Sequence, residues 1–309
     1  MVQHYPLIVL GTGPAGCTAA IYAARANIPT AIITGLEQGG QLTKSIKIEN
    51  WPGTSEGITG MTLMENMLTQ AQRFNAKVIA DNISQVKLTT KPFYLQGDNA
   101  TYTCDGLIIA TGASAKYLGL PSEQKYLGHG VSACAICDGF FYKNQKVAVV
   151  GGGNTAIENA LHLAQLASEV TIIHRRDQFR AEAILVNQIK KLPNINFELN
   201  YTVEEILGNE LGVTGIRLKN VGTNITKPLE VAGVFIAIGY KPNTDIFAGQ
   251  LTMNQGYLKT NYNYPTATSI PGVFAAGDVT EQNYHQAVVA AGSGCMAALD
   301  VKKFFDSNV

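Results

Sequence analysis

The sequence has no excess of charge of either sign, because 23 basic and 23 acidic residues cancel across 309 positions. Proteins that bind nucleic acid or anionic membranes by charge carry a basic surplus, so neither partner is expected. No apolar run approaches the roughly 18 residues that span a membrane. The hydrophobic share of 46% and the charged share of 15% are typical of a folded globular protein. The length suits two domains.

Cysteine is scarce, with five residues in the chain. Cys17, Cys104 and Cys295 stand alone among small or apolar residues, as buried cysteines often do. The first strand is expected to begin at about Tyr5, which leaves no room for a cleavable leader. An odd cysteine count without a leader predicts a reducing, cytoplasmic location and no structural disulfide framework.

The remaining cysteines, Cys134 and Cys137, form one close pair in the segment ACAICDGFF. Zinc sites use four ligands, usually as two such pairs, and the sequence has no second pair. No metal is therefore expected. A structural staple is the other alternative. A two-residue spacing in a reducing compartment favours a disulfide that opens and closes during a reaction.

The chain opens with an apolar strand, a glycine turn and an alanine-rich helix, in the segment YPLIVLGTGPAGCTAA. This is the dinucleotide-binding fingerprint in its required context. Gly11 allows the tight turn, Gly13 admits a pyrophosphate and Gly16 lets the helix pack closely. Glu37, about 20 residues further on, is where a carboxylate would hold a ribose hydroxyl; a solvated loop charge is the alternative.

A second fingerprint follows, with Gly151, Gly153 and Ala156 between a strand and a helix. Its next strand ends differently from that of an NAD site, in a basic cluster made of His174, Arg175, Arg176 and Arg180. Guanidinium groups match phosphate oxygens, so this cluster predicts NADP with its 2′-phosphate. The first fingerprint lacks such arginines and is left for FAD.

Later strands return the chain to its nucleotides at residues 107–113, 233–240 and 272–279. The last of them ends in Gly277 and Asp278, followed by a helix expected from about Tyr284 to Phe304. This order predicts an α/β protein with two Rossmann-like dinucleotide-binding domains, the second inserted in the first. The FAD domain is expected at residues 1–115 and 242–309, and the NADPH domain, with the cysteine pair, at 116–241.

The motifs ACAICDGFF, GGGNTA, HRRDQFRA, GVFAAGD and GCMAALD, in this order, resemble the bacterial, low-molecular-weight thioredoxin reductases over essentially the whole chain. The resemblance implies a homodimer in which NADPH reduces FAD, FAD reduces the Cys134–Cys137 disulfide and the dithiol reduces thioredoxin. It also implies that the two domains rotate relative to each other. Cys137 would lie next to the flavin, Cys134 would attack thioredoxin and Asp138 would be the acid. Phe140 and Phe141 would help to dock thioredoxin, or would simply pack in the core.

The resemblance also implies two sets of cofactor-binding residues. Those expected at FAD are Gly11, Thr12, Gly13, Pro14, Ala15, Gly16, Leu36, Glu37, Gly40, Gln41, Leu42, Asn50, Ala110, Thr111, Gly112, Gly277, Asp278, His285, Gln286 and Ala287. Those expected at NADPH are Gly151, Gly153, Asn154, Thr155, Ala156, His174, Arg175, Arg176, Arg180, Ile238 and Gly239.

The chain departs from the family pattern at His129 and His285, where arginine is usual, and at Ile136, where threonine is common. An imidazole is mostly neutral at pH 7, so contacts at the two histidines, His129 and His285, are expected to differ from those of the family's arginines. Related flavoenzymes that serve a peroxiredoxin system or take electrons from ferredoxin are the rival interpretations. A nucleotide-binding redox sensor without turnover is a further one.

Overall fold

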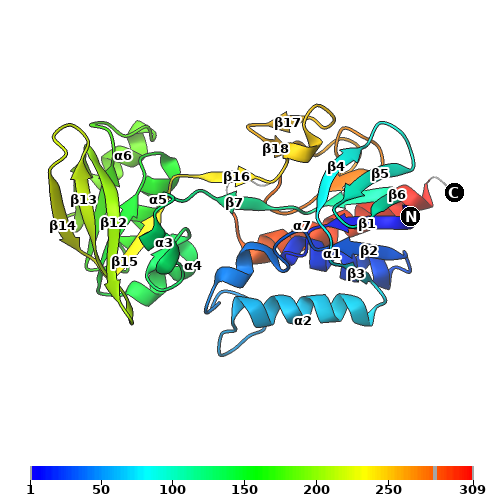
Figure 1. Cartoon of the computed structure of the whole chain (residues 1–309), viewed down its shortest axis with the longest axis horizontal. Helices are drawn as coiled ribbons and strands as arrows, with labels where there is room; N and C mark the ends of the chain where they lie inside the picture. The colour runs from blue at the N-terminus through cyan, green and yellow to red at the C-terminus, as the bar shows by residue number, and fades with distance from the viewer. Residues whose placement is uncertain (1, 281–283, 308–309) are drawn as a thin grey trace. The chain divides into compact units, whose positions relative to one another are not determined.

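The structure is a computed structural model, and it describes residues 2–280 and 284–307. The chain divides into two compact units, one made of Met1–Ser114 with Lys241–Val309 and the other of Ala115–Tyr240. Figure 1 shows the insertion by colour: the green-to-yellow unit interrupts a unit that is blue to cyan and orange to red. The predicted α/β class with two Rossmann-like folds is confirmed by the sheets described below.

The first unit is built on a seven-stranded sheet in the order β3-β2-β1-β6-β5-β4, with β19 also paired to β6. Strands β1, β2, β3, β6 and β19 are parallel neighbours, whereas β4 and β5 run antiparallel. The strands are β1 (Val2–Leu10), β2 (Thr30–Ile33), β3 (Lys77–Ile79), β4 (Ile83–Lys87), β5 (Phe93–Gly97), β6 (Thr101–Ile109) and β19 (Val273–Ala275).

Helices α1 (Pro14–Arg25), α2 (Gly60–Arg73) and α7 (Ala287–Asp306) complete this unit. Its smaller elements are η1 (Gly40–Lys44), η3 (Asp245–Phe247), β17 (Met253–Asn254) and β18 (Tyr257–Leu258). A side chain at Gly294 of α7 would begin 2.1 Å from the Ala15 carbonyl oxygen, so α7 lies directly against the start of α1. Helix α7 begins later than expected, at Ala287, because His285 has a φ of 44° and Gln286 is extended.

The second unit has a five-stranded parallel sheet in the order β11-β10-β9-β15-β8. Its strands are β8 (Val131–Ser132), β9 (Lys146–Val150), β10 (Glu169–His174), β11 (Ile195–Leu199) and β15 (Gly233–Ile236). The helices are α3 (Pro121–Lys125), α4 (Ala135–Asp138), η2 (Gly139–Tyr142), α5 (Asn154–Leu163) and α6 (Ala183–Ile189). An antiparallel sheet of β12 (Tyr201–Asn209), β13 (Gly212–Asn220) and β14 (Thr226–Glu230) completes it.

The two crossings between the units are β7 (Ala113–Ala115) and β16 (Tyr240–Pro242), and they pair with each other as a two-stranded sheet. The expected domain boundaries, after residues 115 and 241, lie one residue beyond those of the structure. No described helix is long and apolar enough to cross a membrane.

A buried carboxylate, that of Asp81, accepts hydrogen bonds from the loops at the β4–β5–β6 end of the first sheet. Asp81 is 5% exposed and accepts hydrogen bonds of 2.7–3.3 Å from the Tyr102 hydroxyl and from backbone N–H groups in the 82–100 loops. Burial alone would raise the pKa of Asp81, but the donors, led by Tyr102, outweigh it and hold the pKa below its ordinary value.

We expect Asp81→Asn to lower the free energy of unfolding by about 2–4 kcal/mol, because an amide places N–H groups against N–H donors. Since the folded-state pKa lies below the unfolded one, the carboxylate stabilises fully above the ordinary value of ~3.9 and progressively less as the pH falls through the folded-state pKa. Urea unfolding at neutral and acid pH measures both effects. Asp98→Asn, an exposed carboxylate of the same loop region, is the control; equal losses for both variants would contradict the prediction.

Candidate active site

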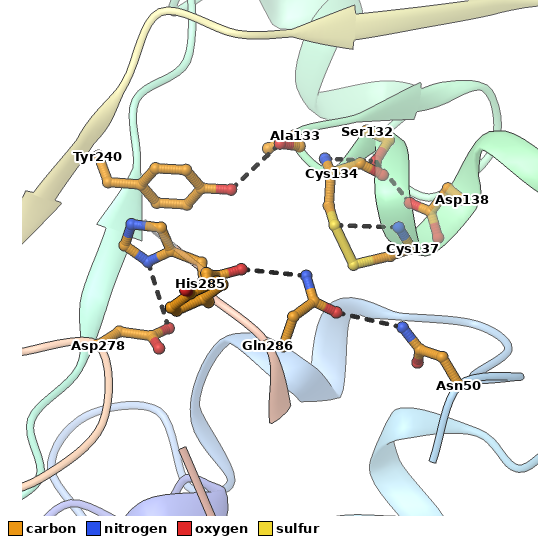
Figure 2. Close-up of a disulfide and its surroundings, with 11 residues drawn as sticks. Asn50, Ser132, Ala133, Cys134, Cys137, Asp138, Tyr240, Asp278, His285 and Gln286 are labelled. Atoms are coloured by element: carbon orange, nitrogen blue, oxygen red, sulfur yellow. Dashed lines mark hydrogen bonds and ion pairs between the residues drawn. A yellow bond between two sulfur atoms is a disulfide. The ribbon is translucent and has the colours of Figure 1, made fainter. Parts of the chain in front are cut away.

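The cysteine pair is closed as a disulfide, with an S–S distance of 2.05 Å and 5.3 Å between the Cα atoms. Cys134 is the N-cap residue of α4, and its sulfur accepts a hydrogen bond of 3.1 Å from the Cys137 N–H (Figure 2). Both cysteines are half-buried. Once the bond opens, an N–H donor pointing at Cys134 Sγ stabilises a thiolate there. The geometry therefore suits Cys134 as the attacking sulfur.

Asp138, the last residue of α4, lies beside the pair and is half-buried. Ser132 Oγ donates to Asp138 Oδ2 at 2.5 Å, as Figure 2 shows. Burial raises the pKa of Asp138, and the hydrogen bond from Ser132 partly offsets the rise. Burial also raises the pKa of Tyr142 to about 12, with the Asp138 charge as the second cause. A carboxyl group that holds its proton above the ordinary range is suited to protonate a thiolate.

Two polar residues of this site were not predicted from the sequence. Ser132 stands two positions before Cys134, and its hydroxyl also accepts from the Cys134 N–H at 3.0 Å. The Tyr240 hydroxyl donates to the Ala133 carbonyl at 3.1 Å and so fixes the segment before the disulfide. The spacing of Ser132 to Cys134 is a local signal that sequence reasoning can use, whereas Tyr240 is more than 100 positions away.

An apolar surface patch, made of Ile136, Phe140 and Phe141, adjoins the disulfide in the sequence. These side chains are 58%, 64% and 40% exposed. The two rings lie edge to face, 6.4 Å apart. Core packing, the alternative for Phe140 and Phe141, does not describe side chains with this exposure.

In the first unit, the glycine turn before α1 packs tightly against its neighbours at Gly11 and Gly16 and is open at Gly13. A side chain at Gly11, whose φ is 104°, would begin 2.3 Å from the Ala110 carbonyl oxygen, and one at Gly16 would begin 1.9 Å from the Gly11 carbonyl oxygen. A side chain at Gly13 would meet no atom within 4 Å. The first turn of α1 has neither a side-chain cap nor an acidic residue. This cradle fits the pyrophosphate of a dinucleotide.

Other residues expected at FAD also lie in the first unit. Some of them make hydrogen bonds within the protein itself. Thr12 is buried and links the Gly39 N–H to the Thr34 carbonyl through its hydroxyl. Asn50 Nδ2 donates to Gln286 Oε1 at 3.3 Å, which connects the 45–51 loop to the start of α7 (Figure 2). The structure also describes the remaining positions. Pro14 and Ala15 open α1, and Gly40, Gln41 and Leu42 begin η1. Gly112 follows β6, Gly277 follows β19, and Ala287 is the first residue of α7.

Three further positions show what surrounds the expected flavin residues. Asp278 Oδ2 lies 3.7 Å from His285 Nδ1. Glu37 is exposed, as is Leu36, and its carboxylate lies 3.1 Å from Lys44 Nζ. The Thr111 hydroxyl donates to the Asn243 carbonyl at 2.8 Å, a contact between segments that the sequence keeps far apart. Asn243 was not predicted.

The second glycine turn repeats the first. A side chain at Gly151, whose φ is 156°, would begin 2.3 Å from the Ala237 carbonyl oxygen, whereas Gly153 faces open space. Helix α5 starts at Asn154 without a side-chain cap or an acidic residue in its first turn. Thr155 is exposed and Ala156 is buried. Ile238 and Gly239 follow β15 on the same edge of the sheet. The geometry again fits a pyrophosphate.

The arginine segment is fastened directly onto this second turn. The Arg180 N–H donates to the Gly152 carbonyl at 2.7 Å. Asn154 and Glu182 exchange two hydrogen bonds, of 2.9 and 3.0 Å. Arg175, Arg176 and Arg180 are all exposed, and no ion pair with an acidic side chain is found for them in residues 2–280 and 284–307. Their guanidinium groups are thus available to an anion beside the turn.

His174 lies behind the turn and not in front of it. Its ring is 5% exposed and stacks on Phe179 at 5.6 Å, and a side chain at Gly152 would begin 2.3 Å from its Nδ1. Nε2 has no hydrogen-bond partner among the described residues. Burial lowers the pKa of His174, and the nearby arginines lower it further. A neutral ring in this position supports the turn.

No group of His, Cys, Asp and Glu that could hold a metal ion is found in the described part of the chain. Two nucleotide-binding folds and a disulfide in one chain define oxidoreductases that use a pyridine nucleotide to open a disulfide. The family model described as pyridine nucleotide-disulphide oxidoreductase matches residues 5–294.

Individual relatives narrow this class. The chain is 56% identical to the thioredoxin reductase of Vibrio cholerae over 313 residues, which covers 99% of the chain and 98% of that protein. A protein of Pseudomonas fluorescens with another name, glucosaminate ammonia-lyase, is 55% identical over 99% of the chain and 97% of its own length. The solved thioredoxin reductase of Giardia duodenalis has a TM-score of 0.93 and 37% identity, over 98% and 99% of the two chains. The chain belongs to the pyridine nucleotide-disulphide oxidoreductases and, within them, to the thioredoxin reductase family.

Proposed function

We propose that the protein reduces the disulfide of thioredoxin with electrons from NADPH, through FAD and the Cys134–Cys137 pair. The observation that carries this proposal is the half-buried disulfide at the start of α4, with Asp138 beside it. When bound, FAD would supply two electrons to the disulfide, and NADPH would replenish them as a hydride. The open cradle at Gly13 supports FAD in the first unit, and the cradle at Gly153 with its arginines supports NADPH in the second.

The exchange with thioredoxin needs only the chain's own sulfur atoms. The Cys134 thiolate attacks one sulfur of the thioredoxin disulfide, forms a mixed disulfide and releases a thiolate on thioredoxin. The Cys137 thiolate then attacks Cys134 Sγ, closes the Cys134–Cys137 bond and releases the second thioredoxin thiolate. Two electrons pass to thioredoxin, and its thiolates take up two protons. Asp138 is the proposed acid for a thiolate of this site.

The remaining residue roles are part of the same proposal. The patch of Ile136, Phe140 and Phe141 presents apolar surface to thioredoxin, which is consistent with its exposure. His174 supports the second turn from behind, while the three arginines bind the 2′-phosphate. We also propose a homodimer in the cytoplasm, as the family resemblance implies.

An anaerobic titration of the yellow, FAD-loaded protein tests this function. We expect NADPH to bleach the visible flavin absorbance, NADH to bleach it far less readily, and added oxidised thioredoxin to restore it. If NADPH leaves the flavin oxidised, a donor such as ferredoxin becomes the better hypothesis. If the flavin bleaches and thioredoxin does not restore it, the cofactors stand and the partner is wrong, as it would be for an enzyme of a peroxiredoxin system. The Pseudomonas fluorescens relative is 55% identical to this chain and yet carries another name, glucosaminate ammonia-lyase. The thioredoxin step of this experiment is therefore the decisive one.

A further inference from the structure

The Ser132 hydroxyl connects the acid of the site with the backbone of the attacking cysteine. Ser132 is 8% exposed and ends β8, where it pairs with Phe235 of β15. Its oxygen accepts from the Cys134 N–H at 3.0 Å and lies 2.5 Å from Asp138 Oδ2 and 3.4 Å from the Cys134 carbonyl oxygen. The sheet fixes the position of this side chain, and all three neighbours belong to the disulfide segment (Figure 2).

A hydroxyl has one proton to donate, whereas two acceptors lie within reach of Ser132. With Asp138 ionised, the better acceptor is the carboxylate, and the hydroxyl points to it. With Asp138 protonated, the acid itself donates to Ser132 Oγ, and the serine proton is left for the Cys134 carbonyl. The Cys134 N–H donates to Oγ in both states. The Cys134 carbonyl also accepts from the Asp138 N–H at 3.1 Å, so it keeps a partner when the serine proton points to the carboxylate.

We propose that Ser132 is a positioning residue that holds Asp138 against the disulfide and turns its hydroxyl between the Asp138 carboxylate and the Cys134 carbonyl as Asp138 loses and gains its proton. This inference rests on the proposed function, in which Asp138 is the acid. Ser132 stabilises the ionised state of Asp138 and so makes it a stronger acid than burial alone would leave it.

The proton balance gives this switch a place in the reaction. Two electrons, supplied ultimately by NADPH, break the Cys134–Cys137 bond and leave two thiolates. Asp138 gives its proton to the Cys134 sulfur, which leaves one thiol, one thiolate and a carboxylate. The Ser132 hydroxyl then turns to this carboxylate. When Cys134 must become a thiolate to attack thioredoxin, Asp138 takes the proton back and the hydroxyl returns to the Cys134 carbonyl.

Other titratable groups near Asp138 are few among the described contacts. In η2, Tyr142 has a pKa of about 12, because burial and the Asp138 charge raise it, so it stays protonated through the neutral range. On α5, His162 Cδ2 lies 3.6 Å from where a side chain at Gly139 would begin. The cysteines complete the set. His162→Gln, which removes the imidazole next to this segment, serves as the control that assigns any pH effect to Asp138.

Titration of Asp138 in Ser132→Ala tests the inference without thioredoxin or turnover. Difference infrared spectroscopy against pH follows the carboxyl stretch, identified as the band that Asp138→Asn removes. We expect this band to persist to higher pH in Ser132→Ala than in the wild type, and Ser132→Thr, which keeps the hydroxyl, to restore the wild-type titration. An unchanged titration in Ser132→Ala would overturn the inference, whether or not thioredoxin proves to be the partner.

A double-mutant cycle adds the kinetic test. We expect Ser132→Ala to lower kcat for disulfide reduction at neutral pH by about 10-fold, and to move the alkaline limb of its pH profile upward. In the Asp138→Asn background the same substitution should cost almost nothing, because Ser132 acts through Asp138. An equal loss in both backgrounds would show a merely structural role and reject the proposal. If the wild-type protein does not reduce thioredoxin, the proposed function is rejected instead, and the infrared result is unaffected.

Discussion

In the Cys134→Ser variant, NADPH will still bleach the flavin absorbance, yet the variant will reduce thioredoxin at least ~10³-fold more slowly than the wild type. A serine hydroxyl is not a nucleophile at neutral pH, so the exchange step loses the group that forms the mixed disulfide. The N–H of Cys137 that stabilises a Cys134 thiolate will then point at an oxygen. Stopped-flow absorbance measures the flavin step, and an insulin-coupled or direct thiol assay measures the thioredoxin step.

Cys295→Ser is the matched control, since Cys295 is a partly exposed cysteine outside the disulfide. It should leave both steps at wild-type rates. If Cys134→Ser still reduces thioredoxin at an appreciable rate, the attacking sulfur is Cys137, and the roles assigned to the two cysteines must be exchanged. If Cys134→Ser fails to bleach with NADPH, the substitution has disturbed the nucleotide sites and not only the exchange.

Arg176→Gln will raise the KM for NADPH by about 10–100-fold and leave the KM for NADH unchanged. A charge-assisted hydrogen bond to a phosphate is worth about 1.5–3 kcal/mol, and only NADPH has the 2′-phosphate to accept it. Exposed Arg175 and Arg180 share the charge, so the double and triple variants should approach equal use of the two nucleotides. Steady-state kinetics with each nucleotide measures the ratio.

Arg217→Gln is the control for general loss of positive charge in the same unit, because Arg217 is exposed and pairs with Glu205 on β12. It should leave the preference for NADPH intact. The contrary result for Arg176→Gln is an equal rise in both KM values. That outcome would mean that the arginine segment supports the second glycine turn through its backbone, as the Arg180 to Gly152 hydrogen bond already does, and does not read the phosphate.

The sequence predicts most of this fold because its strongest signals are local. Strand, glycine turn and helix succeed one another at Gly11 and again at Gly151, and the structure has β1 with α1 and β9 with α5 at these places. The predicted start of the last helix was wrong by three residues, since the left-handed His285 and the extended Gln286 delay it to Ala287. Such backbone angles depend on the surrounding loops and leave no periodic pattern.

The sequence predicts the two cysteines and the acid of the candidate site, because they are close together in the chain. It predicts the groups that orient them less well. Tyr240 and Asn243 reach their partners across more than 100 positions, so no spacing announces them. His174 belongs to a basic motif by sequence, whereas its buried ring lies against Gly152. Which face a side chain takes at a strand end is decided by packing, which the motif does not encode.

The pairing of β7 with β16 has a consequence for how such a protein can arise. Just inside the second unit, the Lys116 N–H donates to the Gly239 carbonyl at 2.9 Å, and just inside the first, the Asn243 N–H donates to the Gly112 carbonyl at the same distance. The inserted segment therefore begins and ends at one place, and so does the gap it fills. A gene fragment of this kind can enter a host gene, or be exchanged for another, while the host keeps its own sheet unbroken.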